Sequence, residues 1–385
     1  MSEDGGVGVP VGEEDLRAVR GEPVARGEER QRSILLVGRG TVGGRLLAQL
    51  EAIAAPARTG RPVLRLVGVV DRHGVHFAGR GLRATDLPPR SSAPPGAPPD
   101  LTPVLERVAR LPSPVLVDCT AADGMEVPYR EAFRRGIDVV SANKTPLALP
   151  LRVRDGLLAE ARDHGCAWLY ETTVGSSLPV IETLQALVAT GDVVERIEGS
   201  LSGTLGFLCQ AVMAGTPLSA AVHTARERGY TEPHPRDDLS GLDVARKALI
   251  LAREAGLRLE LEEVEVEPLV PAPLLAEGNP ERFLSRLAEH DLEVGERVTR
   301  LAAAGGSLRY LVQIVPDAAR PVRVGPVAVE RDHPAVSLRG AEALVAFTTR
   351  RHHDHPLVVR GAGAGGEVTA AGVLADVLRL PRSVR

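Results

Sequence analysis

The sequence predicts an α/β protein in which a parallel sheet forms one lobe and a second, α+β lobe follows it. Over the first half of the 385 residues, short runs of branched apolar residues alternate with helix-like stretches, which is typical of βαβ units. From about residue 177 the apolar period becomes predominantly helical, and strand-like runs return only after about residue 307. This change of pattern, in a chain longer than one typical domain, indicates two or three lobes.

The expected elements of the first lobe follow in chain order. Residues 1–31 are rich in Gly, Glu and Arg and have no sustained apolar period, so we expect a flexible tail. The proline-dense segment 87–103 predicts an exposed loop, because proline disfavours both helix interiors and sheet ladders. The predicted helices are residues 45–53 and 126–135, and the predicted strands are residues 34–37, 64–70, 115–119, 139–140 and 168–171.

The second lobe is expected to be helical from residue 177 to about residue 304, with two interruptions. A strand is predicted at residues 193–200, and a polar loop is predicted at residues 230–240. A last helix should begin at about residue 368. Before it, further strands are predicted at residues 308–315, 322–329 and 344–348.

The composition favours an enzyme that acts on a small molecule. The net charge of −4 gives no strongly basic surface of the kind that binding to nucleic acid or to an anionic membrane needs. No apolar run reaches about 18 residues and the N-terminus is acidic and Gly-rich, so we expect neither a membrane span nor a signal peptide, and a cytoplasmic location. The cysteines are odd in number and far apart, which indicates reduced, mostly buried thiols: Cys119, Cys166 and Cys209.

A glycine-rich turn directly follows the first predicted strand and opens a helix. Its Gly-x-Gly-x-x-Gly spacing lets the backbone approach a pyrophosphate at a helix N-terminus, so it predicts a Rossmann-type dinucleotide-binding lobe. The next strand ends at Asp71, where an acid would take the ribose hydroxyls of NAD, whereas Arg39 and Arg72 could hold the 2′-phosphate of NADP. The choice between NAD and NADP therefore stays open. The candidate residues of the turn are Gly38, Arg39, Gly40, Thr41, Val42 and Gly43.

Only Lys144 and Lys247 are lysines among the 46 Lys and Arg residues. The abundance of Ala, Gly, Pro and Arg suggests a coding bias that removes lysine wherever any cation serves, so the two survivors mark positions where arginine fails. A desolvated lysine can release its proton near neutral pH, and arginine cannot. We therefore interpret both lysines as candidate catalytic residues, with chance survival as the alternative.

Acidic residues gather beside Lys247. The loop at residues 230–240 and the helix after it carry four of them: Glu232, Asp237, Asp238 and Asp243. Such a cluster could receive an ammonium group of a substrate and leave Lys247 to exchange a proton with a hydroxyl or carbonyl oxygen. The alternative is structural, with Ser240 and Asp243 as a capping box and Asp243 paired with Lys247. The polar face of this helix should include Glu254, and its inward face Leu242, Ala245, Leu249 and Ala252.

Five further segments resemble, in order, the signatures of the homoserine dehydrogenase family. They are VVSANKTPLA (139–148), YETTVGSSLPVIETL (170–184), EGSLSGTLGFL (198–208), YTEPHPRDDLSGLDVARKALILARE (230–254) and GAGAGGEVTAAGV (361–373). Several long motifs in register are far more specific than one alone, and with the glycine turn they span nearly the whole ordered chain. The resemblance implies NAD(P)-dependent interconversion of L-aspartate 4-semialdehyde and L-homoserine, in threonine and methionine biosynthesis, with a lysine as proton donor.

The resemblance also implies roles for individual residues. The implied catalytic residues are Lys247, Lys144 and Asp243, and the identity of the donor lysine stays open. The implied substrate-binding residues are Glu232, Asp238, Gly203 and Thr204. A second glycine turn, containing Gly363 and Gly365, would return the C-terminus to the cofactor. A sodium or potassium ion would bind oxygen ligands of Glu171, Val174, Ser176 and Leu178.

The implied domain limits divide the chain after the tail. Residues 32–173, completed by residues 361–385, would form the dinucleotide-binding domain. Residues 174–314 would bind substrate and carry the catalytic groups, and residues 315–360 would supply strands to a homodimer interface. Because the chain ends soon after its last glycine turn, we expect a monofunctional protein without an appended regulatory domain.

Departures from the family pattern occur at His234, at Ser176 with Ser177, and at residues 341–343, and they bear on fine substrate specificity and the cation site. The alternatives are a dehydrogenase of another amino alcohol and a non-catalytic dinucleotide sensor. An aldehyde dehydrogenase that works through a thioester needs an activated cysteine, and no cysteine lies in a nucleophile motif. We interpret the histidine-rich tract 351–355 as a solvated turn rather than a metal site.

Overall fold

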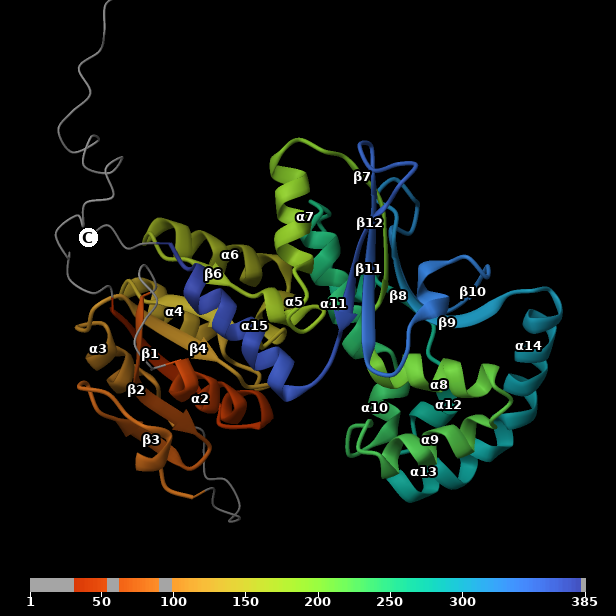
Figure 1. Ribbon diagram of the computed structural model, residues 1–385, viewed down its shortest axis with the longest axis horizontal. Helices are drawn as coiled ribbons and strands as arrows, with labels where there is room; N and C mark the ends of the chain where they lie inside the picture. The colour runs from red at the N-terminus through yellow and green to blue at the C-terminus, as the bar shows by residue number, and fades with distance from the viewer. Residues whose placement is uncertain (1–30, 54–61, 90–98, 382–385) are drawn as a thin grey trace, which may run out of the picture.

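The computed structural model describes residues 31–53, 62–89 and 99–381, which form two lobes (Figure 1). Each lobe is built on a six-stranded sheet. Residues 1–30 of the expected tail lie outside the described residues, whereas Gln31 already belongs to the first strand, where it pairs with Val63.

The first lobe contains the predicted parallel sheet. Its strand order is β3-β2-β1-β4-β5-β6, and all neighbouring strands are parallel except the edge pair β2 and β3. The bounds are β1 Gln31–Val37, β2 Val63–Asp71, β3 Gly74–Phe77, β4 Pro114–Asp118, β5 Asp138–Ser141 and β6 Trp168–Leu169. The chain runs from β1 to β2 on one side and then to β4 on the other, so the crevice at the carboxyl ends of β1 and β4 is the place where such sheets bind ligands.

Helices cover both faces of this sheet, because alternate residues of β1 point to opposite sides. Ile34 and Leu36 pack with the apolar residues of α2 (Thr41–Ile53) and α15 (Gly366–Arg379). Leu35 and Val37 face the other side, which is covered by α3 (Thr102–Val108), α4 (Glu126–Arg134) and α6 (Leu151–Asp163). The last helix, α15, therefore returns from the C-terminus to the first lobe and lies beside α2 (Figure 1).

One local expectation for this lobe is wrong. The proline-dense segment was expected to stay without helix as far as Pro103, but α3 begins at Thr102 and contains that proline. A proline in the first helical turn costs no hydrogen bond, since the first N–H groups of a helix have no partner within it. Residues 90–98 of the segment lie outside the described residues.

The second lobe has a mostly antiparallel sheet in the order β12-β11-β7-β9-β10-β8. Its strands are β7 Val194–Ser200, β8 Glu265–Val266, β9 Ser307–Ile314, β10 Val322–Val329, β11 Glu342–Thr349 and β12 Leu357–Ala362. Its helices include α8 Gly203–Met213, α9 Leu218–Glu227, α10 Pro235–Leu239, α12 Ala272–Leu275, α13 Pro280–Leu287 and α14 Asp291–Ala303. The expected domain limit after residue 314 falls between β9 and β10, which pair along their whole length.

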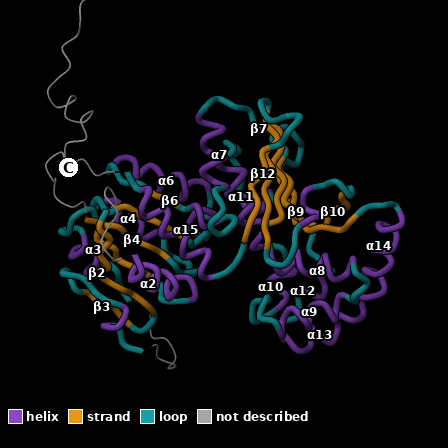
Figure 2. Tube along the Cα trace, viewed as in Figure 1, coloured by secondary structure: helices purple, strands orange, loops and turns teal. Residues whose placement is uncertain are grey.

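Helix α11 (Leu242–Glu254) lies where the lobes meet. It contacts β9 and β10 of the second sheet, α7 (Val180–Ala189), and the short helix α5 (Thr145–Ala148) that follows the first sheet. Figure 2 shows α7 and α11 among the helices that separate the two groups of strands. Ala245, Leu249 and Ala252 are fully buried as expected, but Leu242 is exposed because it lies at the start of the helix.

Candidate active site

The glycine turn that joins β1 to α2 brings strand, helix and neighbouring loop unusually close. Gly38 has a φ of 91°, and a Cβ there would clash with the backbone of Cys119. A Cβ on Gly43 would clash with the carbonyl of Gly38, whereas the space beside Gly40 is open. Thr41 is the first residue of α2. The turn therefore presents open backbone and a helix N-terminus at the carboxyl ends of β1 and β4, which fits a pyrophosphate.

Asp71 at the end of β2 is paired with Arg39 of the glycine turn. The two side chains form an ion pair of 2.9 Å, each side chain being only 9% exposed, and Arg39 also donates to the carbonyl of Pro88. Burial alone would raise the pKa of Asp71, but the N–H of His73 and the charge of Arg39 outweigh it and lower that pKa. Arg72 lies exposed and contacts His73 instead. Of the two arginines, Arg39 is thus the one held against Asp71.

The second glycine turn lies against the first. The N–H of Gly363 donates to the carbonyl of Ala341, and Gly365 precedes α15 with a φ of 124°. The next residue, Gly366, approaches Thr41 so closely that a Cβ would clash with its side chain. The structure thus places the C-terminal turn beside the start of α2.

The two lysines of the chain meet on one carboxylate. Lys144 lies 2.7 Å from Oδ1 of Asp243, and Lys247 lies 2.9 Å from Oδ2. Lys144 comes from the turn after β5 in the first lobe, whereas Asp243 and Lys247 lie one turn apart on α11. Lys247 also donates to the carbonyl of Leu201 at the end of β7, at 2.8 Å. Lys144 and Asp243, which are 99 positions apart in the chain, are therefore held together by charge across the junction of the lobes.

Asp243 does not cap the helix that carries it. The residue before α11 is Gly241, with a φ of 74°, and Ser240 accepts only the N–H of Leu242. Of the structural alternative, the capping box of Ser240 and Asp243 is therefore wrong, whereas the ion pair of Asp243 with Lys247 is present. Burial alone would raise the pKa of Asp243, but the charges and hydrogen bonds of both lysines hold that pKa well below its usual range. The carboxylate therefore stays ionised. Two ammonium groups on one carboxylate leave one net positive charge at this place.

The acidic loop lies beside these groups and is partly folded. Residues 230–240 were expected to be a loop, but Pro235–Leu239 form α10. Asp238 accepts the N–H of Glu232 at 2.8 Å, and burial raises its pKa to about 6, with repulsion from Glu232 and Asp243 adding to the shift. Thr204 at the start of α8 donates to the carbonyl of Tyr230 at 2.6 Å. The structure therefore brings together Glu232, Asp238 and Thr204, while Asp237 pairs with Arg236.

Gly203 is the first residue of α8, directly before Thr204. A Cβ on Gly203 would lie 3.6 Å from the Cα of Ala341, the residue whose carbonyl accepts the N–H of Gly363 in the second glycine turn. Ser202 caps this helix by accepting the N–H of Leu205. The turn therefore connects the acidic loop with the C-terminal turn.

The expected cation ligands lie in a tight turn before α7. The carboxylate of Glu171 accepts the N–H groups of Ile181 and Glu182 at 2.7 and 2.8 Å, so it closes the start of that helix. Burial raises the pKa of Glu171, against these hydrogen bonds. Ser176 has a φ of 62°, and its hydroxyl bonds Thr369 of α15 at 2.7 Å. Two other expected ligands, Val174 and Leu178, have buried side chains in the same turn.

A buried polar network supports Lys144 and was missed by the sequence analysis. Tyr129 donates to Asp118 at 2.7 Å, and the amide of Asn143 donates to Asp118 at 3.2 Å and to the carbonyl of Ala122 at 2.8 Å. Burial raises the pKa of Asp118. The signal that could have found it is an acid at the end of a parallel strand, since polar side chains there face the ligand edge of the sheet.

The remaining candidates lie elsewhere. Burial raises the pKa of the Cys119 and Cys209 thiols, which disfavours the thiolate that a thioester route requires. In the tract 351–355, His353 pairs with Glu195 at 2.7 Å on the surface. His234 precedes α10 and caps it, because its Nδ1 accepts the N–H of Arg236. None of the described helices is both long enough and apolar enough to cross a bilayer.

Comparisons with known proteins agree with this arrangement. A family described as "Homoserine dehydrogenase" matches residues 179–378, and one described as "Homoserine dehydrogenase, NAD binding domain" matches residues 38–171. A bifunctional aspartokinase/homoserine dehydrogenase of Arabidopsis thaliana is 39% identical over 356 residues; the match covers 90% of this chain but only 38% of the relative.

A second relative matches this chain over nearly its whole length. The homoserine dehydrogenase of Schizosaccharomyces pombe is 34% identical over 92% of this chain and 96% of its own. A crystal structure of a Candida auris protein of unknown function superposes with a TM-score of 0.81 and 32% identity, and covers 91% of this chain and 98% of that one. Matches of this extent confirm the family that the motifs predict: the chain belongs to the homoserine dehydrogenase family.

Proposed function

We propose that the protein interconverts L-homoserine and L-aspartate 4-semialdehyde with a nicotinamide dinucleotide. The observation that carries this proposal is the pair of lysines held by Asp243 at the junction of the lobes. One partner comes from the end of the dinucleotide-type sheet and the other from the second lobe, so a substrate bound between them would lie next to a cofactor in the glycine turn. The family membership supports the same reaction.

The lysines exchange the proton of the substrate oxygen. An ammonium group has three N–H donors, and Lys247 uses two, on Asp243 and on the carbonyl of Leu201, which leaves one for a substrate oxygen. In the reducing direction a lysine donates this proton to the developing alkoxide, and in the oxidising direction it accepts the hydroxyl proton. The bound nicotinamide supplies or accepts the hydride. The net positive charge of the two lysines and Asp243 stabilises the alkoxide.

The acidic loop holds the amino group of the substrate. Asp238 accepts the N–H of Glu232 and lies close enough to Asp243 to be repelled by it, so the two acids of the loop can together attract an ammonium group, which a neutral alcohol lacks. Thr204 and Gly203 line the same turn from α8. This arrangement selects an amino alcohol over a simple alcohol.

The dinucleotide is proposed to bind the first lobe, residues 32–173 completed by 361–385, while residues 174–314 bind substrate. Asp71 supports NAD, because a carboxylate accepts hydrogen bonds from ribose hydroxyls and repels a phosphate. Arg39 supports NADP, because it lies against the same carboxylate and can turn to a phosphate. We propose that both cofactors bind, with Asp71 and Arg39 deciding the preference.

A homodimer through residues 315–360 and a monovalent cation complete the proposal. The edge strand β12 has Val358 exposed, and an apolar edge strand is commonly covered by a partner. Sedimentation velocity measures the oligomeric state.

The proposed cation site lies in the turn before α7. Because the carboxylate of Glu171 is bonded to the first N–H groups of α7, a sodium or potassium ion would depend on main-chain carbonyls of the turn. A higher unfolding temperature in potassium or sodium chloride than in choline chloride is the expected result.

Turnover with a panel of amino alcohols tests the proposed reaction. Reduction of NAD and NADP is followed by absorbance with L-homoserine, L-serine and L-threonine, and the expected result is turnover with L-homoserine at the highest kcat/KM. A higher kcat/KM with another amino alcohol would show that this compound, and not L-homoserine, is the preferred substrate. Dinucleotide binding without any turnover would identify a sensor instead.

Substitution of Lys247 tests the proton-transfer role. We expect Lys247→Arg to lower kcat by about 100-fold or more, because guanidinium keeps its proton near neutral pH, while the Kd for the dinucleotide stays unchanged. Arg246→Lys, one residue earlier on the same helix, is the matched control and should retain activity. A rate near that of the unaltered enzyme in Lys247→Arg would remove this lysine from proton transfer.

Substitution of Asp71 tests the cofactor assignment. We expect Asp71→Ala to weaken NAD binding about tenfold, because charged hydrogen bonds to the ribose are lost, and to weaken NADP binding less, since Arg39 is released from its partner. Fluorescence titration with both reduced dinucleotides measures the two Kd values. Asp163→Ala, on the remote end of α6, is the control. Equal losses for the two cofactors would count against Asp71 as the ribose acid.

The raised pKa of Asp238 predicts a pH dependence. With a pKa of about 6, the carboxylate is charged above that pH and becomes neutral as the pH falls through it, so its attraction for the substrate ammonium is lost on the acid side. We expect the KM for homoserine to rise about tenfold from pH 7 to pH 5. In Asp238→Asn the KM should be high at both pH values, whereas Asp237→Asn should keep the dependence. An unchanged profile in Asp238→Asn would rule out this residue as its origin.

A further inference from the structure

The short helix α5 links Lys144 to the rest of the first lobe. Lys144 precedes this single turn, Thr145–Ala148, and α6 begins at Leu151. One turn of helix is too short to fix its own direction, because helix formation needs several hydrogen bonds to offset its nucleation cost. The position of Lys144 must therefore depend on what holds α5.

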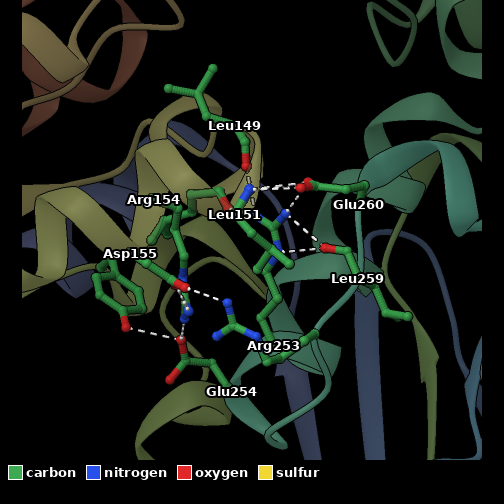
Figure 3. A network of polar contacts seen from close by, with 11 residues as sticks. Leu149, Leu151, Arg154, Asp155, Arg253, Glu254, Leu259 and Glu260 are labelled. Atoms are coloured by element: carbon green, nitrogen blue, oxygen red, sulfur yellow. Dashed lines mark hydrogen bonds and ion pairs between the residues drawn. The ribbon is translucent and has the colours of Figure 1, made fainter.

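Arg253, at the other end of α11, holds the carboxyl end of α5. Its Nη1 donates to the carbonyls of Leu147 and Leu149 at 2.7 and 2.8 Å. Its Nε and Nη2 donate to the carbonyl of Leu259 at 3.1 and 2.8 Å, and Nη2 also donates to Glu260 at 3.0 Å. Figure 3 shows Arg253 with three of these partners: Leu149, Leu259 and Glu260. The five hydrogen bonds match the five N–H donors of an arginine.

Two acidic neighbours of Arg253 extend the attachment to α6. Glu260 accepts the N–H of Leu151, the first residue of α6, at 3.1 Å. Glu254 accepts Arg154 of α6 at 3.0 Å and the hydroxyl of Tyr170 at 2.9 Å (Figure 3). Glu254 was expected on the solvent-facing side with Asp243, but its side chain is only 7% exposed because it lies against the first lobe. The C-terminal end of α11 is thus joined to the first lobe by charge.

Burial makes this attachment specific. The side chain of Arg253 is 1% exposed, and burial lowers its pKa, so the charge persists only because every donor has a partner. A lysine at this position has three donors and no planar fork, so it cannot bind all of these acceptors.

We propose that Arg253 is a positioning residue that sets Lys144 against Asp243 and Lys247. Helix α5 is attached to α11 at both ends, by the ion pair of Lys144 with Asp243 at one end and by the carbonyls bonded to Arg253 at the other. Asp243 and Arg253 are ten residues apart on a rigid helix, which places them about 15 Å apart along its axis. The guanidinium is thus a second point at which the position of α5 along α11 is fixed. The inference rests on the proposed dehydrogenase function.

The test compares two buried arginines. In Arg253→Lys we expect kcat for homoserine oxidation to fall roughly ten- to hundredfold with the KM for NAD(P) changed less than about threefold, since small misplacements of a catalytic group lower kcat steeply. The matched control is Arg309→Lys. Arg309 is equally buried and donates to Ala335, Val336, Ser307 and Leu308 in the second lobe, far along the chain from α5. The Arg309→Lys variant should have an unfolding temperature that is lowered to a similar extent, but an unchanged kcat.

A double substitution separates positioning from stability. If Arg253 acts through Lys144, Arg253→Lys lowers kcat no further in a Lys144→Met background, although it still lowers the unfolding temperature. Independent, multiplicative losses, or a kcat equal to that of Arg309→Lys, would overturn the inference. Should Arg253→Lys not fold, Glu260→Gln removes one anchor of the guanidinium and should lower kcat three- to tenfold. Turnover by the unaltered enzyme is measured first, because its absence refutes the proposed function instead.

Discussion

The attraction of two lysines for one carboxylate is the interaction on which the rest of the site depends. Asp243 binds Lys144 from the first lobe and Lys247 from its own helix, so a single carboxylate joins the two lobes at the proposed site. Without Asp243, two ammonium groups would lie close together and repel each other. With it, the site keeps both primary amines, one net positive charge and a fixed distance between the end of a parallel sheet and α11.

Other features of the fold position the groups around Asp243. The strand order of the first sheet opens a crevice at the ends of β1 and β4, where the glycine turn lies. The C-terminal helix α15 returns to pack on α2, so the last glycine turn reaches the same crevice. Arg253 and Glu254 bind the far end of α11 to the first lobe, and the network around Asp118 and Asn143 holds the turn that carries Lys144. Buried polar groups that are fully hydrogen-bonded in this way confer a single arrangement on a site.

Much of the fold could be predicted because local patterns specify local structure. Five of the six strands of the first sheet and helices α2 and α4 lie within a few residues of the positions that the alternation of apolar runs predicts, whereas the short edge strand β3 was not predicted. The pattern failed mainly where helices begin, because rules for the interior of a helix do not hold in its first turn. Pro103 lies inside a helix, residues 235–239 form α10 within an expected loop, and Leu242 is exposed on an expected inward face. The two-residue strand β8 pairs with β10 far along the chain, so no local period could mark it.

The sequence by itself determined the candidate residues of the proposed site: two lysines in an arginine-rich chain, a glycine turn after a strand, and acids around Lys247. These choices show in the sequence because only a primary amine, a residue without a side chain, or a carboxylate meets the need. Tertiary structure alone decided that Lys144 meets Asp243, that Arg39 pairs with Asp71, and that Glu254 turns inward beside Arg253. These pairings join residues that are 32 to 100 positions apart in the chain. The spacing of residues along the chain does not encode such contacts, because they arise only from tertiary packing.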